Sequence, residues 1–383
     1  MSPDSDRGWA AFAAWAWFLS RAAFFLVALL SVLVLPDGGN GPTAFSQARG
    51  ALKDNGCSGN FFCRFVSWDA LWYVDVATHG YSFNESRQSN VNFFPLYPAL
   101  VSVGAAATGN VWLSAFLISN LALVGALYFF YRLARMDYDA PSARRALVYL
   151  LVFPASFFLS IPYTESLFLL LSVAAFYFAR KQDWAMAAAA GFLAGMTRPV
   201  GIILVVPLAM EYLSSRRAGP WLAFALAPAA GMAAYFAFLW AKLGEPLAWL
   251  RMQHFFSRGF FTENPSNYFL GTIVWPWVLL TPRYAEEWLS LAFWVIGFAV
   301  LALALFRRVR APYAAYLLLT FAAMFTGGLI TSAHRYLMMA FPLFFILGAE
   351  GKNEVVDRAV LLVLSALLAL TIILFANNYW GVF

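Results

Sequence analysis

The chain has 383 residues, of which 62% are hydrophobic and only 11% are charged, and its mean hydropathy is +0.70. This composition excludes an ordinary soluble globular protein, which needs more charge to cover its surface. The net charge of +6 does not indicate nucleic-acid binding, because arginines in short loops between apolar segments account for it through the positive-inside bias of membrane proteins.

Long apolar segments follow one another along the chain, and we predict an all-α polytopic membrane protein with a single membrane domain, 1–383. The first segment is too long for a signal-peptide core and is predicted to be an uncleaved anchor. Arg21 lies inside it, which indicates that one face of this helix points into the protein. Since a span takes roughly 20 apolar residues, we predict about eleven helices, at 9–35, 111–131, 145–161, 165–180, 184–198, 200–214, 220–241, 286–306, 311–331, 336–349 and 359–376.

Basic residues predict the orientation of these helices. With the N-terminus in the cytoplasm, the short inner segments carry most of the arginines, as the positive-inside bias requires. The basic residues of these segments are Arg7, Arg132, Arg135, Arg144, Arg145, Arg180, Lys181, Arg216, Arg217, Arg307, Arg308, Arg310, Lys352 and Arg358.

Two external loops, 36–110 and 242–285, are too long to be simple connectors. Within the first loop, 68–80 has helical character, and 95–109 is predicted to be an interfacial or re-entrant helix. Cys57 and Cys63 also lie in this loop. They form either a disulfide, if the compartment is oxidising, or two free thiols.

The segment Trp68–Tyr81 is polar, acidic and rich in aromatic residues in a chain that is otherwise almost all apolar. On a regular helix, Asp69 and Asp75 point in different directions, so they do not form a catalytic carboxylate pair. Asp75 and His79 are one turn apart and can contact each other. His79 is interpreted first as a structural hydrogen-bonding residue and second as a base.

Two interpretations of Asp69 are open at this point. An Asp at the start of a helix can accept backbone N–H bonds and interact with the helix dipole. A carboxylate beside hydrocarbon carries a large desolvation cost, however, and usually has a function. Asp69 is therefore either a helix cap or the acidic group of an active site.

Several further polar residues are predicted on the same external side, and each could instead be structural. Taken together, arginines near carboxylates on one face indicate a site for an anionic substrate, because Arg matches phosphate geometry. No metal-ligand spacing is present, and we predict neither a metal nor a cofactor. The candidate residues are Asp75, His79, Glu165, Arg198, Arg251, Arg258, His334 and Arg335.

An ordered set of motifs resembles the PIG-V-like mannosyltransferases, the bacterial relatives of an enzyme of GPI-anchor synthesis. The resemblance covers roughly 65 to 345, most of the chain. The motifs are Trp68–Tyr73, Ala77–Tyr81, Phe93–Pro98, Phe153–Phe157, Tyr163–Phe168, Thr197-Arg198, His334–Tyr336 and Phe341-Pro342.

This resemblance implies a GT-C glycosyltransferase fold, with a long first external loop. It also implies an inverting transfer of mannose from a polyprenyl-phosphate donor to a hydroxyl of a glycolipid, glycan or protein. By the same resemblance, Asp69 matches the family's catalytic base, and the site faces the outside of a bacterial cytoplasmic membrane. Among the arginines, Arg198 and Arg335 are the first candidates for the donor phosphate, with Arg251 and Arg258 behind them. We expect a monomer with no nucleic-acid partner.

Two other classes of function remain as alternatives. A transporter or flippase for a lipid-linked sugar would also use many spans and an external anionic site, but the chain lacks an evident inverted repeat. A non-catalytic membrane scaffold would not need the acidic first loop. Turnover of a polyprenyl-phosphate sugar distinguishes the enzyme from both.

Overall fold

The computed structural model describes residues 8–36, 61–86, 88–215, 220–253, 285–307, 309–326 and 332–379. Within these ranges the chain is all-helical, which confirms the predicted fold class. Its longer helices are α1 (Trp9–Val34), α3 (Asp69–His79), α4 (Leu96–Thr108), α5 (Val111–Ala134), α6 (Ala140–Val152), α7 (Glu165–Arg180), α8 (Trp184–Gly195), α9 (Val205–Ser214), α10 (Ala227–Leu243), α13 (Ala285–Phe306), α14 (Ala311–Thr326), α16 (Pro342–Glu350) and α17 (Glu354–Ala376). The shorter ones are η2 (Phe61–Phe65), η3 (Asn90–Asn92), η4 (Ser156–Leu159), η5 (Pro199–Leu204), η6 (Pro220–Leu226), α11 (Ala248–Met252) and α15 (Ala333–Met339).

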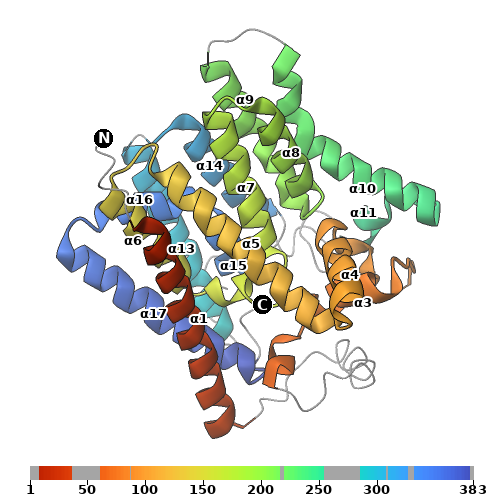
Figure 1. The fold of residues 1–383 in the computed structure, drawn as a ribbon, viewed down its shortest axis with the longest axis horizontal. Coiled ribbons are helices and arrows are strands. Elements are labelled where there is room, and N and C mark those ends of the chain that lie inside the picture. The colour runs from red at the N-terminus through yellow and green to blue at the C-terminus, as the bar shows by residue number, and fades with distance from the viewer. Residues whose placement is uncertain are drawn as a thin grey trace.

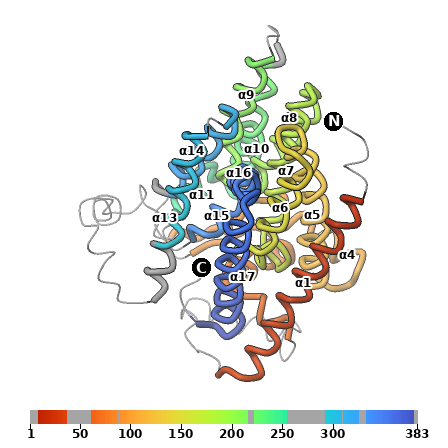
Figure 2. Tube along the Cα trace, turned by 90° about the vertical axis from the view of Figure 1, so that its left-hand side faces the viewer, coloured from red at the N-terminus to blue at the C-terminus, as the bar shows by residue number. Residues whose placement is uncertain are grey.

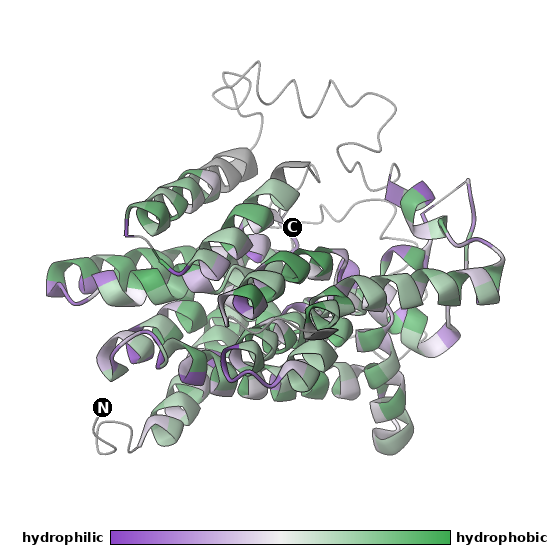
Figure 3. Ribbon diagram, turned by 90° about the horizontal axis from the view of Figure 1, so that it is seen from above, coloured by the Kyte–Doolittle hydropathy of each residue, from purple (hydrophilic) through white to green (hydrophobic). Residues whose placement is uncertain are grey.

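Four of the described helices are long and apolar enough to cross a membrane: Trp9–Val34, Val111–Ala134, Leu222–Leu243 and Glu354–Ala376. Their outer faces carry exposed apolar side chains such as Leu33, Leu121 and Leu362. Apolar residues therefore cover the outside of the molecule as well as its interior (Figure 3), as expected where lipid replaces water.

The predicted count of eleven helices is not confirmed, because several predicted spans are broken. The span 145–161 ends as a helix at Val152, where Phe153 turns to an extended conformation before Pro154. The span 336–349 breaks at Ala340, just before Pro342 opens α16. Proline removes a backbone donor, which favours a break at both places, and Pro154 also restricts the residue before it.

Helix α7 lies in the centre of the bundle, and nearly all its residues are buried. Figure 2 shows α13 and α14 on one flank and α1, α4 and α5 on the opposite flank, with α15 and α16 between them. Helices α3 and α4 pack together near the start of α5 (Figure 1). This arrangement brings α3, from the loop that was predicted to be external, against the N-terminal end of α7.

Arg21 attaches α1 to the broken segment that follows α6. Its side chain is buried, with Nη1 donating to the carbonyl of Ser156 at 2.7 Å and Nη2 donating to that of Leu151 at 3.0 Å. These carbonyls are available because the helix has ended. The predicted inward orientation of Arg21 is confirmed.

Charged loops from distant parts of the chain meet at one end of the bundle. Arg180 at the end of α7 pairs with Asp137 at 2.6 Å, and Lys352 before α17 pairs with Asp139 at 3.0 Å. Tyr313 in the first turn of α14 donates to the same Asp137 at 3.0 Å. The basic segments around Arg135, Arg180 and Lys352, which the sequence analysis assigned to one side, therefore lie together in space.

Candidate active site

Helix α3 begins abruptly at Asp69. Trp68, the residue before it, has a φ of 61°, in a region that side-chain-bearing residues rarely adopt. Such strained positions cluster at functional sites. Ala70 and Val74 on one face of α3 are buried in the core, and Gly80, with a φ of 79°, ends the helix. Asp69, the first residue of α3, therefore lies between a rigid helix and a strained turn.

The Asp69 carboxylate forms an ion pair and does not cap the helix. Its Oδ2 accepts a hydrogen bond from Nη2 of Arg335 at 2.9 Å, and α3 has no side-chain cap. The predicted hydrogen-bonded cap is therefore not observed, although Asp69 does lie in the first turn of α3, where the helix dipole favours a carboxylate. The side chain remains 28% exposed, so a substrate can reach it.

Glu165, the first residue of α7, is completely buried between two arginines. Its Oε1 accepts from Nε of Arg335 at 2.8 Å and lies 2.9 Å from Nη1 of Arg198. Two carboxylates and two guanidinium groups are joined in this way, and their formal charges cancel. Burial of charge is tolerated only with such pairing.

Arg198 reaches the site from the turn after α8. Pro199 follows it, which favours the extended backbone observed at Arg198. Besides contacting Glu165, its Nη1 donates to the Thr164 hydroxyl at 3.0 Å, and Tyr73 lies 3.2 Å from the same hydroxyl. Burial raises the pKa of Tyr73 well above its usual range, with Arg198 opposing the shift. Tyr73 is therefore a neutral hydrogen-bonding group.

Arg335 on α15 is held by aromatic rings as well as carboxylates. Its Cζ lies 4.8 Å from the ring centre of Phe158 and 4.9 Å from that of Tyr163, within cation–π range. His334, its neighbour, is buried between the rings of Phe158 and Phe293. His334 does not line the pocket described next, so its predicted role in substrate binding is not supported.

A pocket whose atom-free space of about 440 Å³ includes open solvent lies beside this charged network. It combines one carboxylate and one guanidinium with amide, hydroxyl and aromatic groups, a lining suited to a polar ligand with an attached apolar part. The lining residues are Asp69, Tyr73, Asn92, Phe93, Phe94, Thr197, Arg198, Pro199, Trp249, Gln253 and Tyr336.

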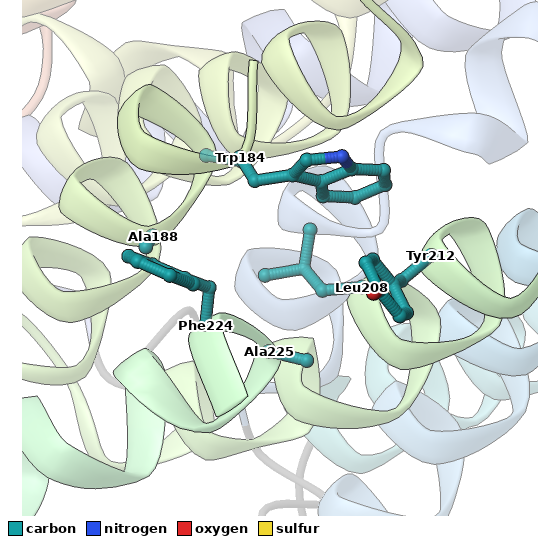
Figure 4. A pocket seen from close by; sticks show the side chains of 7 residues that line it. Trp184, Ala188, Leu208, Tyr212, Phe224 and Ala225 are labelled. Atoms are coloured by element: carbon teal, nitrogen blue, oxygen red, sulfur yellow. The ribbon is translucent and has the colours of Figure 1, made fainter. Parts of the chain in front are cut away.

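A second pocket of about 210 Å³ lies between α8, α9 and η6. Figure 4 shows Trp184, Leu208, Tyr212 and Phe224 around it. Its lining contains no charged residue, so the first pocket is the candidate active site.

Other predicted site residues lie outside this pocket. Asp75 accepts from Asn90 at 2.7 Å and contacts His79 at 3.1 Å, which attaches α3 to the loop that follows it. Arg251 is exposed and pairs with Glu85. These predicted binding roles of Asp75, His79 and Arg251 are not supported by their positions.

Two further predictions fall partly or wholly on undescribed residues. Arg258 and Cys57 lie outside the described residues. Cys63 is not a free thiol, while its pairing with Cys57 stays a prediction. Within the described ranges, no group of three or more metal-binding side chains lies together, and the independence from metal also stays a prediction.

The sequence analysis missed the amides Asn92 and Gln253 and the rings Trp249 and Tyr336. Asn92 directly precedes the Phe93–Pro98 motif, and Tyr336 ends the quoted motif His334–Tyr336 but was not singled out as a site residue. Trp249 and Gln253 are one turn apart on the short helix α11 and its end, where no sequence pattern marked them.

Comparison with known proteins identifies the family of this chain. Residues 12–216, more than half of the chain, match the family described as "Mannosyltransferase (PIG-V)". A relative, GPI mannosyltransferase 2 of Chaetomium globosum, is 29% identical over 179 residues, which is 42% of this chain and 37% of the relative. The aligned part thus spans little more than a third of that protein.

Solved structures of the Archaeoglobus fulgidus oligosaccharyltransferase are among those to which this chain is similar. The form tethered to an acceptor peptide is 11% identical, with a TM-score of 0.47 over 98% of this chain and 55% of that chain. The apo form is 13% identical, with a TM-score of 0.45 over 98% and 56%. Similarity at this level supports no conclusion about activity. The family match, which includes Asp69, Glu165 and Arg198, carries the assignment: this chain belongs to the PIG-V mannosyltransferase family.

Proposed function

We propose that this membrane protein transfers a mannosyl group, with inversion, from a polyprenyl-phosphate donor to a hydroxyl acceptor. The observation that carries the proposal is the accessible carboxylate of Asp69 in a pocket that also contains Arg198. A lipid-linked donor suits a pocket at the edge of an apolar helical bundle, where the prenyl chain can lie along exposed apolar helix faces.

Asp69 acts as the base in this proposal. The acceptor oxygen attacks the anomeric carbon, the bond from that carbon to the phosphate oxygen breaks, and the hydroxyl proton passes to Asp69. The lipid phosphate leaves with the bonding electron pair. One base is sufficient because a phosphate is already a fair leaving group and needs positive charge more than it needs a proton.

The two arginines take different roles. Arg198 lines the pocket, so its guanidinium is the candidate partner for the leaving phosphate. Arg335 does not line the pocket; its contacts with Asp69 and Glu165 make it a positioning residue. It fixes Oδ2 of Asp69, while the described residues offer Oδ1 no hydrogen bond, which leaves that oxygen for a substrate hydroxyl.

The site lies on the extracytoplasmic side in this proposal. The basic loops gather at the opposite end of the bundle, with Arg180 and Lys352 among them. Positive loops favour the cytoplasmic side. No metal or cofactor takes part in the proposed reaction. The acceptor is a hydroxyl of a glycolipid, a glycan or a protein.

The Asp69→Asn variant tests the proposal. Purified protein is incubated with polyprenyl-phosphate mannose and a panel of hydroxyl acceptors, and mannosyl transfer is measured. Loss of a general base lowers the rate by about a hundredfold to ten-thousandfold. Asp75→Asn is the matched control on the same helix and keeps near-wild-type activity. A folded Asp69→Asn protein with full activity contradicts the role of Asp69 as base. If the wild-type protein moves the lipid across vesicle membranes but transfers no mannose, the proposal that it is an enzyme is contradicted.

A further inference from the structure

Two amide side chains meet at the wall of the candidate active site. Asn92 ends η3 in the first external loop, and Gln253 directly follows α11, far along the chain. Nε2 of Gln253 lies 2.6 Å from Oδ1 of Asn92. Both residues line the pocket that contains Asp69.

The flanking core holds this amide pair in place. Val91 and Phe94, on either side of Asn92, are buried with Ala248 and Met252 of α11. The Tyr235 hydroxyl from α10 donates to the carbonyl of Val91 at 2.7 Å. The pair is therefore presented by packed elements, which is the arrangement that specific recognition needs.

Hydrogen bonding fixes the orientation of both amides. Nε2 of Gln253 also lies 2.8 Å from the carbonyl oxygen of Trp249, and a carbonyl can only accept. The Gln253 atom in this position is therefore the NH₂ group, and the Asn92 atom that it meets is an oxygen. The NH₂ group of Asn92 and Oε1 of Gln253 remain as one donor and one acceptor.

An aromatic ring completes this part of the pocket. Trp249 packs against Phe94 and Phe236 and lines the same pocket. Its Nε1 is buried and, like that of Trp72, Trp112 and Trp184, has no hydrogen-bond partner among the described residues, so Trp249 contributes its ring and not an accessible donor. The wall thus offers an apolar ring surface, one donor group and one acceptor, all uncharged.

We propose that Asn92, Gln253 and Trp249 form a subsite that recognises the hydroxyl groups of a pyranose ring. Each sugar hydroxyl both donates and accepts, so neighbouring hydroxyls match a fixed donor next to a fixed acceptor. The absence of charge in this trio makes it unsuited to the phosphate, which Arg198 serves. The subsite rests on the proposed function and deepens it, because the ring belongs either to the mannosyl donor or to a sugar acceptor.

Paired binding measurements test the subsite. Dissociation constants are measured for polyprenyl-phosphate mannose and for polyprenyl phosphate without the sugar, using the purified full chain. In Gln253→Met the affinity for the mannosylated lipid falls about tenfold, the equivalent of losing a hydrogen bond or two. The affinity for the sugar-free lipid changes less than about twofold, because Arg198 is unaltered. Gln182→Met, the same change at an exposed site, leaves both values unchanged.

Asn92→Asp provides a second variant that retains the internal hydrogen bond. An aspartate oxygen still accepts from Gln253, but the free NH₂ donor is replaced by an acceptor. The affinity for the mannosylated lipid divided by the affinity for the sugar-free lipid falls, as in Gln253→Met. Because both lipids carry the phosphate, this ratio corrects for repulsion between the phosphate and the new charge. If Gln253→Met fails to fold, Asn92→Asp decides the question.

Octyl mannoside is the probe for the acceptor. If its affinity falls about tenfold while that of the donor is kept, the subsite binds the acceptor sugar. A loss of neither affinity, or an equal loss for both lipids, overturns the subsite. Selective sugar binding by a wild type that transfers no mannose contradicts the proposed function and leaves the subsite standing.

Discussion

Asp69 and Glu165 both contact the Arg335 guanidinium, yet their surroundings differ. The Asp69 side chain is 28% exposed and borders the pocket, while that of Glu165 is 0% exposed. A buried carboxylate needs opposite charge to offset its desolvation, and Oε1 of Glu165 is placed to hold the two arginines together. The accessible carboxylate is the one suited to chemistry.

The Glu165→Gln variant tests this structural role. It leaves two buried guanidinium groups short of one negative charge, so the free energy of unfolding falls by about 3 kcal/mol or more. Glu350→Gln makes the same change in the more exposed pair with Arg307 and costs less than about 1 kcal/mol. Thermal unfolding in detergent measures both. Equal losses for the two variants would contradict the role of Glu165.

Lysine variants of Arg198 and Arg251 distinguish a specific contact with the phosphate from a general effect of positive charge. Arg198 lines the pocket, whereas Arg251 lies in an exposed pair with Glu85. Lysine keeps the charge but loses the planar fork that matches phosphate. We expect Arg198→Lys to raise the KM for the lipid donor about tenfold and Arg251→Lys to leave it unchanged. An unchanged KM in Arg198→Lys would argue against a phosphate contact there.

At the scale of elements, the crossing of α8 and α10 sets the position of the turn that carries Arg198. An added Cβ on Gly195 would lie 2.0 Å from the carbonyl oxygen of Pro228, and one on Gly231 would lie 2.0 Å from that of Phe192. The two backbones are therefore in direct contact, as small residues allow in membrane helix packing.

Gly195→Ala and Gly231→Ala are expected to force these helices apart. Alanine gains about 1 kcal/mol in helix propensity, but a backbone clash is not relieved by a rotamer change. We expect a net loss of about 2 kcal/mol or more, with lower activity since Arg198 moves with α8. Gly125→Ala, whose Cβ meets only the Leu170 side chain at 3.1 Å, costs less than about 1 kcal/mol. Thermal unfolding and transfer assays report both effects, and an unaltered Gly195→Ala protein would refute the close crossing.

Element boundaries were predictable where local signals were strong. The predicted bounds of the helix Glu165–Arg180 are confirmed, and those of the helix Asp69–His79 are correct to within one residue at each end. The sequence analysis placed Asp69, Glu165 and Arg335 on the same side of the protein but did not predict that Arg335 joins the two carboxylates. These residues come from α3, α7 and α15, which meet only through packing. The Asn92–Gln253 contact depends on long-range packing alone, and no local pattern predicts it.

On the scale of the whole molecule, the charged groups divide between two ends. One end gathers the ion pairs of Arg180 and Lys352 with the loop between α5 and α6. The candidate active site lies where α3 meets the first residue of α7, a helix of 16 residues that ends at Arg180. The length of α7 therefore separates the site from the basic end.

This separation predicts opposite accessibility for two exposed loop residues. Ser86 follows α3 on the side of the site, and Gln182 lies in the turn after Arg180. In a background with Cys57→Ser and Cys63→Ser, Ser86→Cys reacts with a membrane-impermeant maleimide in intact cells. Gln182→Cys reacts only after the membrane is opened, because positive loops stay in the cytoplasm. Since a donor displayed outside can be used only by an outward-facing pocket, the reverse pattern of labelling would move the reaction to the cytoplasmic face and require a different source of donor.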